Sequence, residues 1–147
     1  MKYDREAALK RYEEELAEKR KRIDKLMQDD LLDEDGYPSN AALEIIEIWP
    51  SNDIKGWFKF IEGLWYFHHW GWREGECVDD DFEEKEYLYN ISTAGWSGNE
   101  SIIRAMKRNW VLWHLTWEQS HRGGHYIFKL HEYADEPAEI KPAKRVS

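Results

Sequence analysis

The sequence contains a single cysteine, Cys77, among its 147 residues. One cysteine cannot form an intramolecular disulfide, and it excludes a zinc site built from several cysteines. Long apolar runs are also missing, so no segment reaches the length that a membrane-spanning helix requires. The first ten residues are charged and lack the apolar stretch of a signal peptide. We therefore expect a cytoplasmic protein in a reducing compartment, with no membrane partner.

The chain contains fewer basic than acidic residues. The 21 Lys and Arg residues are outnumbered by 30 Asp and Glu residues, which gives a formal net charge of −9. Because proteins bind nucleic acids largely by neutralising phosphates with Lys and Arg, this charge opposes general nucleic-acid binding. It is compatible with a basic protein partner.

Aromatic residues are abundant. The chain holds nine Trp, eight Tyr and five Phe, and 41% of its residues are hydrophobic, which excludes a disordered middle segment. Its length suits one domain with a core built around large rings. Trp and Tyr also serve as stacking platforms on binding surfaces, so this composition indicates either a bulky core or a recognition surface.

Residues 4–28 contain no Gly or Pro and are rich in helix-forming residues, which predicts one long helix. Its apolar residues recur at heptad spacing: Leu9, Tyr12, Leu16, Ile23 and Leu26. Lys19 interrupts the stripe. Two interpretations stay open: the helix docks on its own domain, or it forms a homo-oligomer by pairing with a second copy.

The rest of the chain alternates between helical and strand-like patterns. We expect helices at 41–48, 54–62 and 97–108, strands at 64–73, 85–92, 110–119 and 125–130, and an acidic loop at 74–84. A helix that continues through 110–119 is the alternative there. The predicted fold class is α+β, an antiparallel sheet of about four strands with helices on one face, preceded by the long N-terminal helix.

This reading divides the chain into three parts. Residues 1–35 comprise the N-terminal helix and an acidic linker, residues 36–131 the α+β domain, and residues 132–147 a charged flexible tail.

A glycine-bearing loop between a strand and a helix is the strongest local signal for binding. Glycines let a ligand approach the backbone closely, and the N-terminus of the following helix attracts anions. The spacing of Ser97 and Glu100 also predicts a capping box. The candidate ligand-binding residues here are Ser92, Thr93, Gly95, Trp96, Ser97, Gly98 and Asn99. An ordinary turn leading into a helix is the alternative interpretation.

A second candidate segment follows Trp117, which we place in the same site. Arg122 can bind phosphate or carboxylate through its planar guanidinium, Gly124 belongs to a tight turn, and the His125 imidazole can donate a hydrogen bond to an anion. If strands 85–92 and 125–130 are sheet neighbours, the two loops meet at one edge. A plain Gly-Gly hairpin with solvated side chains is the alternative.

Metal and nucleophile motifs are weak. His68 and His69 are adjacent, so on a strand they would point to opposite faces, and the other histidines lack a compact ligand spacing. No nucleophile-elbow motif is present. We therefore expect no metal, no cofactor and no catalytic residue, although a His-dependent enzyme stays open as an alternative.

The segments Ile-Ser-Thr-Ala-Gly-Trp-Ser-Gly-Asn-Glu-Ser-Ile-Ile (91–103) and Ser-His-Arg-Gly-Gly-His-Tyr-Ile-Phe (120–128) are distinctive. They resemble a family of small uncharacterised proteins encoded by tailed bacteriophages and prophages. The chain departs from that pattern at Ala94, where the family has Gly, and at His121, where it often has Arg. The resemblance covers about 87–130 and implies a phage origin and expression in the host bacterial cytoplasm. It carries no activity with it.

Three functional hypotheses follow. The leading one is a non-enzymatic phage accessory protein that holds a small anionic, nucleotide-like ligand in the glycine-rich site and sequesters a host signalling molecule. The first alternative is an acidic protein-interaction module that inhibits a host defence or nucleic-acid-binding enzyme through the acidic runs 29–35 and 74–84. The second alternative is a phosphoesterase or nuclease that uses His121, His125 and a carboxylate.

Overall fold

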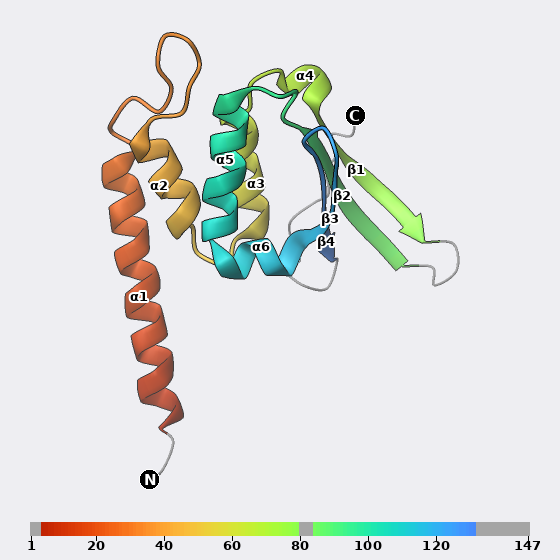
Figure 1. The fold of residues 1–147 in the computed structure, drawn as a ribbon. Helices are drawn as coiled ribbons and strands as arrows, with labels where there is room; N and C mark the ends of the chain where they lie inside the picture. The colour runs from red at the N-terminus through yellow and green to blue at the C-terminus, as the bar shows by residue number, and fades with distance from the viewer. Residues whose placement is uncertain (1–3, 80–83, 132–147) are drawn as a thin grey trace.

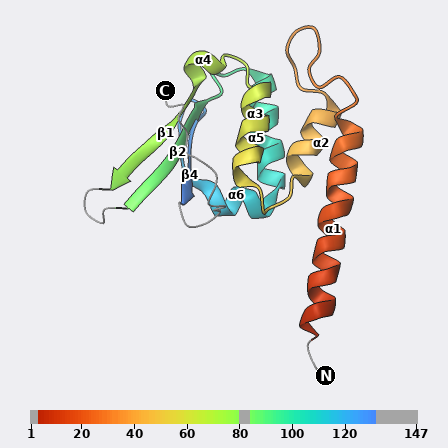
Figure 2. The ribbon, with the colours of Figure 1, turned by 180° about the vertical axis from the view of Figure 1, so that it is seen from behind.

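The structure, a computed structural model, describes residues 4–79 and 84–131. In chain order its elements are α1 (Arg5–Leu26), α2 (Asn40–Ile48), α3 (Ile54–Leu64), α4 (His68–Gly71), β1 (Trp72–Asp79), β2 (Glu84–Ser92), α5 (Ser97–Arg108), α6 (Trp110–Thr116), β3 (Trp117–His121) and β4 (His125–His131). The helices lie on one side of a single sheet (Figures 1 and 2). This arrangement confirms the predicted α+β class with a long N-terminal helix.

The sheet has the strand order β1-β2-β4-β3, and each neighbouring pair is antiparallel. Ile91 of β2 lies opposite Trp72 of β1 on one side and Tyr126 of β4 on the other. The prediction that strands 85–92 and 125–130 are sheet neighbours is therefore confirmed.

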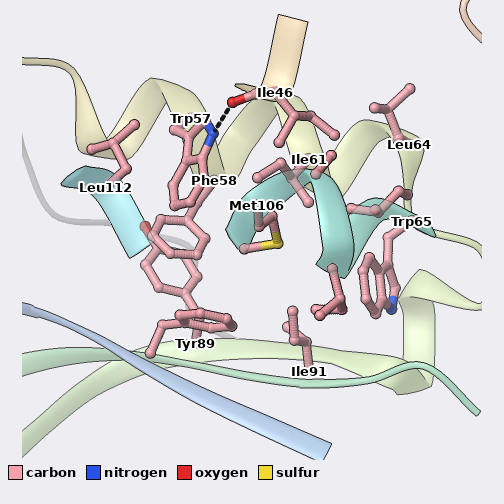
Figure 3. Close-up of a cluster of buried hydrophobic side chains, with 14 of the residues drawn as sticks. Ile46, Trp57, Phe58, Ile61, Leu64, Trp65, Tyr89, Ile91, Met106 and Leu112 are labelled. Atoms are coloured by element: carbon pink, nitrogen blue, oxygen red, sulfur yellow. Dashed lines mark hydrogen bonds between the residues drawn. The ribbon is translucent and has the colours of Figure 1, made fainter. Parts of the chain in front are cut away.

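The core lies between the sheet and helices α3 and α5 (Figure 3). The Phe58 ring of α3 stacks on Tyr89 of β2 with the ring centroids 4.0 Å apart, and Met106 of α5 is fully buried. Trp57 Nε1 donates a hydrogen bond of 3.0 Å to the carbonyl of Ile46, which satisfies the one polar atom of that buried ring (Figure 3). Large rings thus fill the core, as the composition predicts.

Side-chain caps set where several helices begin. Ser39 accepts a hydrogen bond from Ala42 N at the start of α2, and Asp53 accepts one from Gly56 N at the start of α3. These caps satisfy backbone N–H groups that have no partner inside the helix. The helices predicted at 4–28, 41–48, 54–62 and 97–108 are confirmed.

The strand predicted at 64–73 is wrong. Leu64 ends α3, α4 follows at His68–Gly71, and the strand β1 begins only at Trp72. Phe67 adopts a positive φ of 63°, and Trp65 is buried with its Nε1 donating to the Ser92 carbonyl at 3.1 Å. The aromatic residues of this segment therefore serve tertiary packing, which overrides their β propensity.

The acidic loop predicted at 74–84 is also wrong for its described residues. β1 runs to Asp79 in continuous register with β2, and β2 begins at Glu84. Residues 80–83 lie outside the described residues. Backbone pairing with β2 thus extends through an acidic segment that local composition assigns to a loop.

The strand predicted at 110–119 is wrong over its first part, where the alternative of a helix holds. Residues Trp110–Thr116 form α6, and only from Trp117 does the chain continue as β3. Leu112, Trp113 and Thr116 are buried at helical spacing, and Asn109 caps the helix by accepting from Leu112 N. The burial of these residues on one face stabilises the helix relative to the predicted strand.

The division at residue 35 stays a prediction, and the predicted tail at 132–147 lies outside the described residues. Among residues 4–79 and 84–131, no helix is both long enough and apolar enough to cross a membrane.

Candidate functional site

The two predicted loops meet at one end of the sheet, where β2 ends and β4 begins. Ser92 and His125 face each other in the register of β2 and β4, and Thr93 N donates a hydrogen bond of 2.9 Å to the Gly124 carbonyl. A Cβ at position 124 would overlap the Thr93 side chain, so the close contact requires glycine there. The structure therefore brings residues 92–99 and the turn 122–124 together.

The space between the loops is filled by the protein's own side chains. Thr93 and Asn99 are fully buried, and Gly98 is buried as well. Asn99 Oδ1 accepts from Tyr66 N at 3.0 Å, and its Nδ2 donates to the Tyr66 carbonyl at 3.0 Å. Asn99, predicted to contact a ligand, thus connects α5 to the segment before α4.

Trp96 is likewise engaged inside the protein. Its ring lies 4.4 Å from the Tyr66 ring, in a stacked arrangement, and 4.6 Å from the Tyr37 ring. A Cβ at Gly98 would overlap the indole, so Trp96 covers the first turn of α5. Tyr37 and Tyr66 are themselves about two-fifths exposed, at 39% and 40%. Trp96 itself is half-buried, so the most exposed rings of this cluster are those of the two tyrosines, from distant parts of the chain.

The predicted capping box is wrong. Trp96 occupies the N-cap position without a side-chain cap, and Ser97 is the first residue of α5. Ser97 Oγ donates to Tyr37 Oη at 3.2 Å instead of capping the helix. Within the described residues, the backbone N–H groups of Ser97, Gly98 and Asn99 have no hydrogen-bond acceptor. The start of α5 therefore lacks a side-chain cap, and of these three residues only Ser97 is exposed.

The loop before α5 has an unusual backbone. Ala94 and Gly95 both adopt positive φ, at 54° and 73°, and both are exposed. Ser92 Oγ accepts from Ala94 N at 3.2 Å, and Thr93 Oγ1 accepts from Gly95 N at 3.3 Å. Of the predicted site residues, Ser92 and Thr93 therefore shape the loop through side-chain hydrogen bonds to its backbone, and Gly95 supplies one of the backbone N–H donors.

The second turn presents a cation and two imidazoles. Arg122 is exposed, His125 is half-buried, and the His121 and His125 ring centroids lie 5.9 Å apart across the turn. His121 Nε2 lies 2.8 Å from Gln119 Oε1. Among the described residues, no group of three or more His, Cys, Asp or Glu side chains is placed to hold a metal ion.

Trp117 is not brought to these loops. It begins β3 opposite Phe128, at the other end of the hairpin from the turn, and its ring stacks at 6.4 Å on Trp113 of α6. The prediction grouped Trp117 with the turn because the two are close in sequence. An extended strand separates them in space.

Two surfaces were missed by sequence reasoning. A groove of about 740 Å³ runs along β1, lined by residues that include Glu62, Trp72, Glu74 and Glu76. Trp72 Nε1 and Tyr87 Oη donate to the two oxygens of Glu74 at 2.8 Å and 2.6 Å, which fixes its carboxylate in the groove. The segment Trp-Arg-Glu-Gly-Glu-Cys (72–77) has no regular alternation of apolar and polar residues, so no local pattern identified it as a strand.

The other missed surface is apolar and lies on α6. Three residues of that helix are strongly exposed: Trp110, Val111 and Leu115. The assignment of this segment to a strand concealed that these residues lie on the solvent side of a helix.

Comparisons of the chain with protein-family models, with curated proteins and with solved structures found no match.

Proposed function

We propose that the chain is a non-enzymatic binding protein, a phage accessory factor that holds a small anionic, nucleotide-like ligand where residues 92–99 meet the turn 122–124. The observation that carries this proposal is the contact between the two loops, from Thr93 N to the Gly124 carbonyl at 2.9 Å. Through this contact the exposed guanidinium of Arg122 lies at the same end of the sheet as the start of α5.

The anion is held from two directions. Ser97, the exposed first residue of α5, offers its backbone N–H and the positive end of the helix dipole. Arg122 offers a planar pair of donors that suits a phosphate. Because Gly98 lies beneath the Trp96 ring and Asn99 is buried, the ligand lies on the rim of the loops rather than in a deep pocket.

The base of the ligand stacks on a tyrosine. Trp96 already contacts both Tyr37 and Tyr66, which retain exposed surface. Its role is to hold these two rings beside the start of α5. Stacking on an aromatic ring contributes about 1–3 kcal/mol per base in proteins that bind single-stranded nucleic acids.

Calorimetric titration and thermal shift with mono-, di- and cyclic nucleotides test the proposal. We expect at least one nucleotide to bind and to raise Tm, and Arg122→Ala to weaken that binding at least about tenfold, or about 1.4 kcal/mol. Arg11→Ala removes the same charge from an exposed position of α1 and serves as the matched control. No binding by any nucleotide, or equal weakening by both variants, would refute the proposal.

A second candidate, an acidic protein-interaction module, is favoured by the groove along β1. β1 is an edge strand of eight residues in unbroken register with β2, so its outer edge can accept an extended peptide. Glu62, Glu74 and Glu76 give the groove an excess of negative charge over Arg73. The preferred partner is therefore an extended basic segment.

Titration with a synthetic peptide of alternating Lys and Val tests this candidate. Glu76→Lys is expected to weaken binding, while Glu100→Lys makes the same charge change on exposed α5 and leaves it intact. Undiminished binding to the Glu76→Lys variant would exclude the groove.

A further inference from the structure

One side of α6 presents apolar side chains to solvent. Trp110 is 67% exposed, Val111 is 46% exposed and Leu115 is 51% exposed. Helical spacing places them on one side of α6, away from the buried residues of that helix. His114 lies on the same side, and its ring centroid is 4.6 Å from that of Trp110. We call these four residues, Trp110, Val111, His114 and Leu115, the α6 face.

The size of the α6 face indicates what kind of occupant can cover it. Its exposed area is on the order of 400 Å², given the usual areas of tryptophan and aliphatic side chains. One partner in a stable protein–protein complex typically contributes about 800 Å². A segment of the same chain needs less area, because the covalent connection keeps it at a high local concentration. The size therefore favours an occupant from the same chain.

The chain leaves β4 beside this face. The Trp113 ring of α6 lies 5.3 Å from the Phe128 ring of β4, and the two elements are in contact. Phe128 lies opposite Trp117, which directly follows α6, and β4 ends shortly afterwards at His131. Figures 1 and 2 show this end of β4 beside α6. Residues 132–140 can span about 30 Å when extended, whereas α6 is only about 10 Å long, so they can reach across the whole face.

The cations beside the α6 face belong to α5. Residues 101–117 include Arg104, Lys107 and Arg108 but no acidic residue. Lys107 Nζ lies 5.6 Å from the centroid of the Trp113 ring, which places this cation against α6. Within residues 4–79 and 84–131, Arg104 and Lys107 form no ion pair.

The acidic residues on the adjoining segments do not neutralise this charge. Glu47 of α2 pairs with Arg108 at 3.2 Å, and Glu118 of β3 faces a lysine of β4 at 3.8 Å. Asp53, in the loop after α2, caps α3. Glu100 lies in the first turn of α5, at the other end of that helix from α6. The surroundings of the α6 face therefore favour an acidic occupant.

We propose that residues 132–140, which directly follow β4 and lie outside the described residues, dock on the α6 face. Their sequence is Glu-Tyr-Ala-Asp-Glu-Pro-Ala-Glu-Ile, with four acidic residues and no basic one. Tyr133 and Ile140 supply the large apolar side chains. Residues 141–147 contain three basic residues and no acidic one, so like charge keeps them away from the same place.

Docking brings unlike charges and apolar surfaces together. The apolar side chains of the segment cover Trp110 and Leu115, and its carboxylates face Arg104 and Lys107. An apolar face that would otherwise favour non-specific association is thereby removed from water. Composition alone predicts a flexible tail for this segment, and the two descriptions give different experimental results.

Limited proteolysis of the full chain with a glutamate-specific endopeptidase tests the proposal. Mass spectrometry follows the rate of cleavage after Glu139. Because cleavage follows the population of undocked segment, Trp110→Ser/Leu115→Ser should raise this rate at least about fivefold. Trp70→Ser is the matched control and should leave the rate unchanged, since Trp70 is 49% exposed on α4, far from α6 (Figure 1). Equal rates in the parent and the α6 variant would overturn the proposal.

Fluorine NMR of chains labelled with fluorotryptophan tests the contact from the side of the segment. The Trp110 signal is assigned by its absence from the Trp110→Phe variant, and the Trp70 signal in the same way. We expect Tyr133→Ser/Ile140→Ser to shift the Trp110 signal and to leave the Trp70 signal in place. An unchanged Trp110 signal would overturn the proposal, because a flexible tail has no contact to lose.

Charge reversal tests the electrostatic part of the proposal. Arg104→Glu/Lys107→Glu should speed cleavage after Glu139, because the carboxylates of the segment then meet like charge. Lys19→Glu/Lys21→Glu makes the same charge change at exposed positions of α1 and should not. Equal acceleration by the two double variants would contradict charge-directed docking.

Sedimentation velocity distinguishes this occupant from a second copy of the chain. Docking within one chain predicts a cleavage rate that does not depend on protein concentration. A parent dimer that dissociates in the Trp110→Ser/Leu115→Ser variant would assign the α6 face to self-association and overturn the proposal.

Discussion

The indole of Trp96 lies against Gly98, two residues further along the chain, so closely that a Cβ at position 98 would overlap its six-membered ring. Trp96 is the N-cap residue of α5, in an extended conformation, and Gly98 is the second residue of that helix. A glycine that local sequence assigns to ligand approach thus serves first to seat an aromatic ring. The same ring contacts Tyr37 and Tyr66, and so connects three distant segments.

Replacing Gly98 with Ala should destabilise the protein by about 1–3 kcal/mol, because the new methyl group displaces the Trp96 ring. Urea denaturation followed by Trp fluorescence measures the change. Gly63→Ala is the control, because Gly63 is an exposed helical glycine and a Cβ there would meet no other atom. This variant should be more stable than the parent by up to about 1 kcal/mol. Equal stability of Gly98→Ala and the parent would show that the indole moves aside at no cost.

The stability of the protein should change in opposite directions when Ala94 is replaced by Gly and when Gly95 is replaced by Ala. Ala94 adopts a φ of 54°, a conformation that costs a non-glycine residue about 1–2 kcal/mol, so Ala94→Gly should raise stability by about 1 kcal/mol. Gly95 adopts a φ of 73° with nothing near its Cβ position, so Gly95→Ala should lower stability by a similar amount through backbone strain alone. Calorimetric unfolding of both variants checks the signs, and a shift in the same direction would contradict the argument.

Asn99→Ala should lower the free energy of unfolding by at least about 2 kcal/mol, because it leaves the Tyr66 N–H and carbonyl without their side-chain partner. Asn40→Ala, at an exposed position of α2, should change it by less than about 0.5 kcal/mol. Chemical denaturation at neutral pH compares the two. A structural role for Asn99 would be excluded by equal effects.

The Arg22–Glu44 ion pair should make a small pH-dependent contribution to stability. The hydrogen bond from Arg22, 2.9 Å from Nε to Oε2, lowers the pKa of the Glu44 carboxyl below its ordinary value of 4.5. A lowered folded-state pKa stabilises the fold above the ordinary pKa, and this contribution is lost as pH falls through the folded value.

Glu44→Gln should therefore lower Tm at neutral pH by less than Asn99→Ala does, since the pair is exposed. The difference from the parent should shrink as the pH falls below 4.5, the ordinary pKa of that carboxyl. Glu34→Gln, in an exposed loop, should show no such trend in a series of thermal melts. A constant difference between Glu44→Gln and the parent across the acidic range would contradict the assignment.

Local signals were sufficient for much of the fold. The absence of Gly and Pro in 4–28 and the residue patterns of 41–48, 54–62 and 85–92 predicted α1, α2, α3 and β2 correctly. Hydrogen bonding and periodicity within a few residues control such elements, so one segment carries the information. The pairing of β2 with β4, on which the meeting of the two loops depended, was assumed from the sequence and is present in the structure.

What only the tertiary structure decided is which rings fill which space. The segment 110–116 reads as a strand but forms the helix α6, and 64–73 reads as a strand but contains the short helix α4 and enters β1 only at Trp72. The buried residues of both segments pack on partners far away in sequence. The space between the candidate loops is filled because Tyr37 and Tyr66 hold Trp96 beside Gly98. No local pattern encodes such a contact, since it depends on how helices and sheet pack once they have formed.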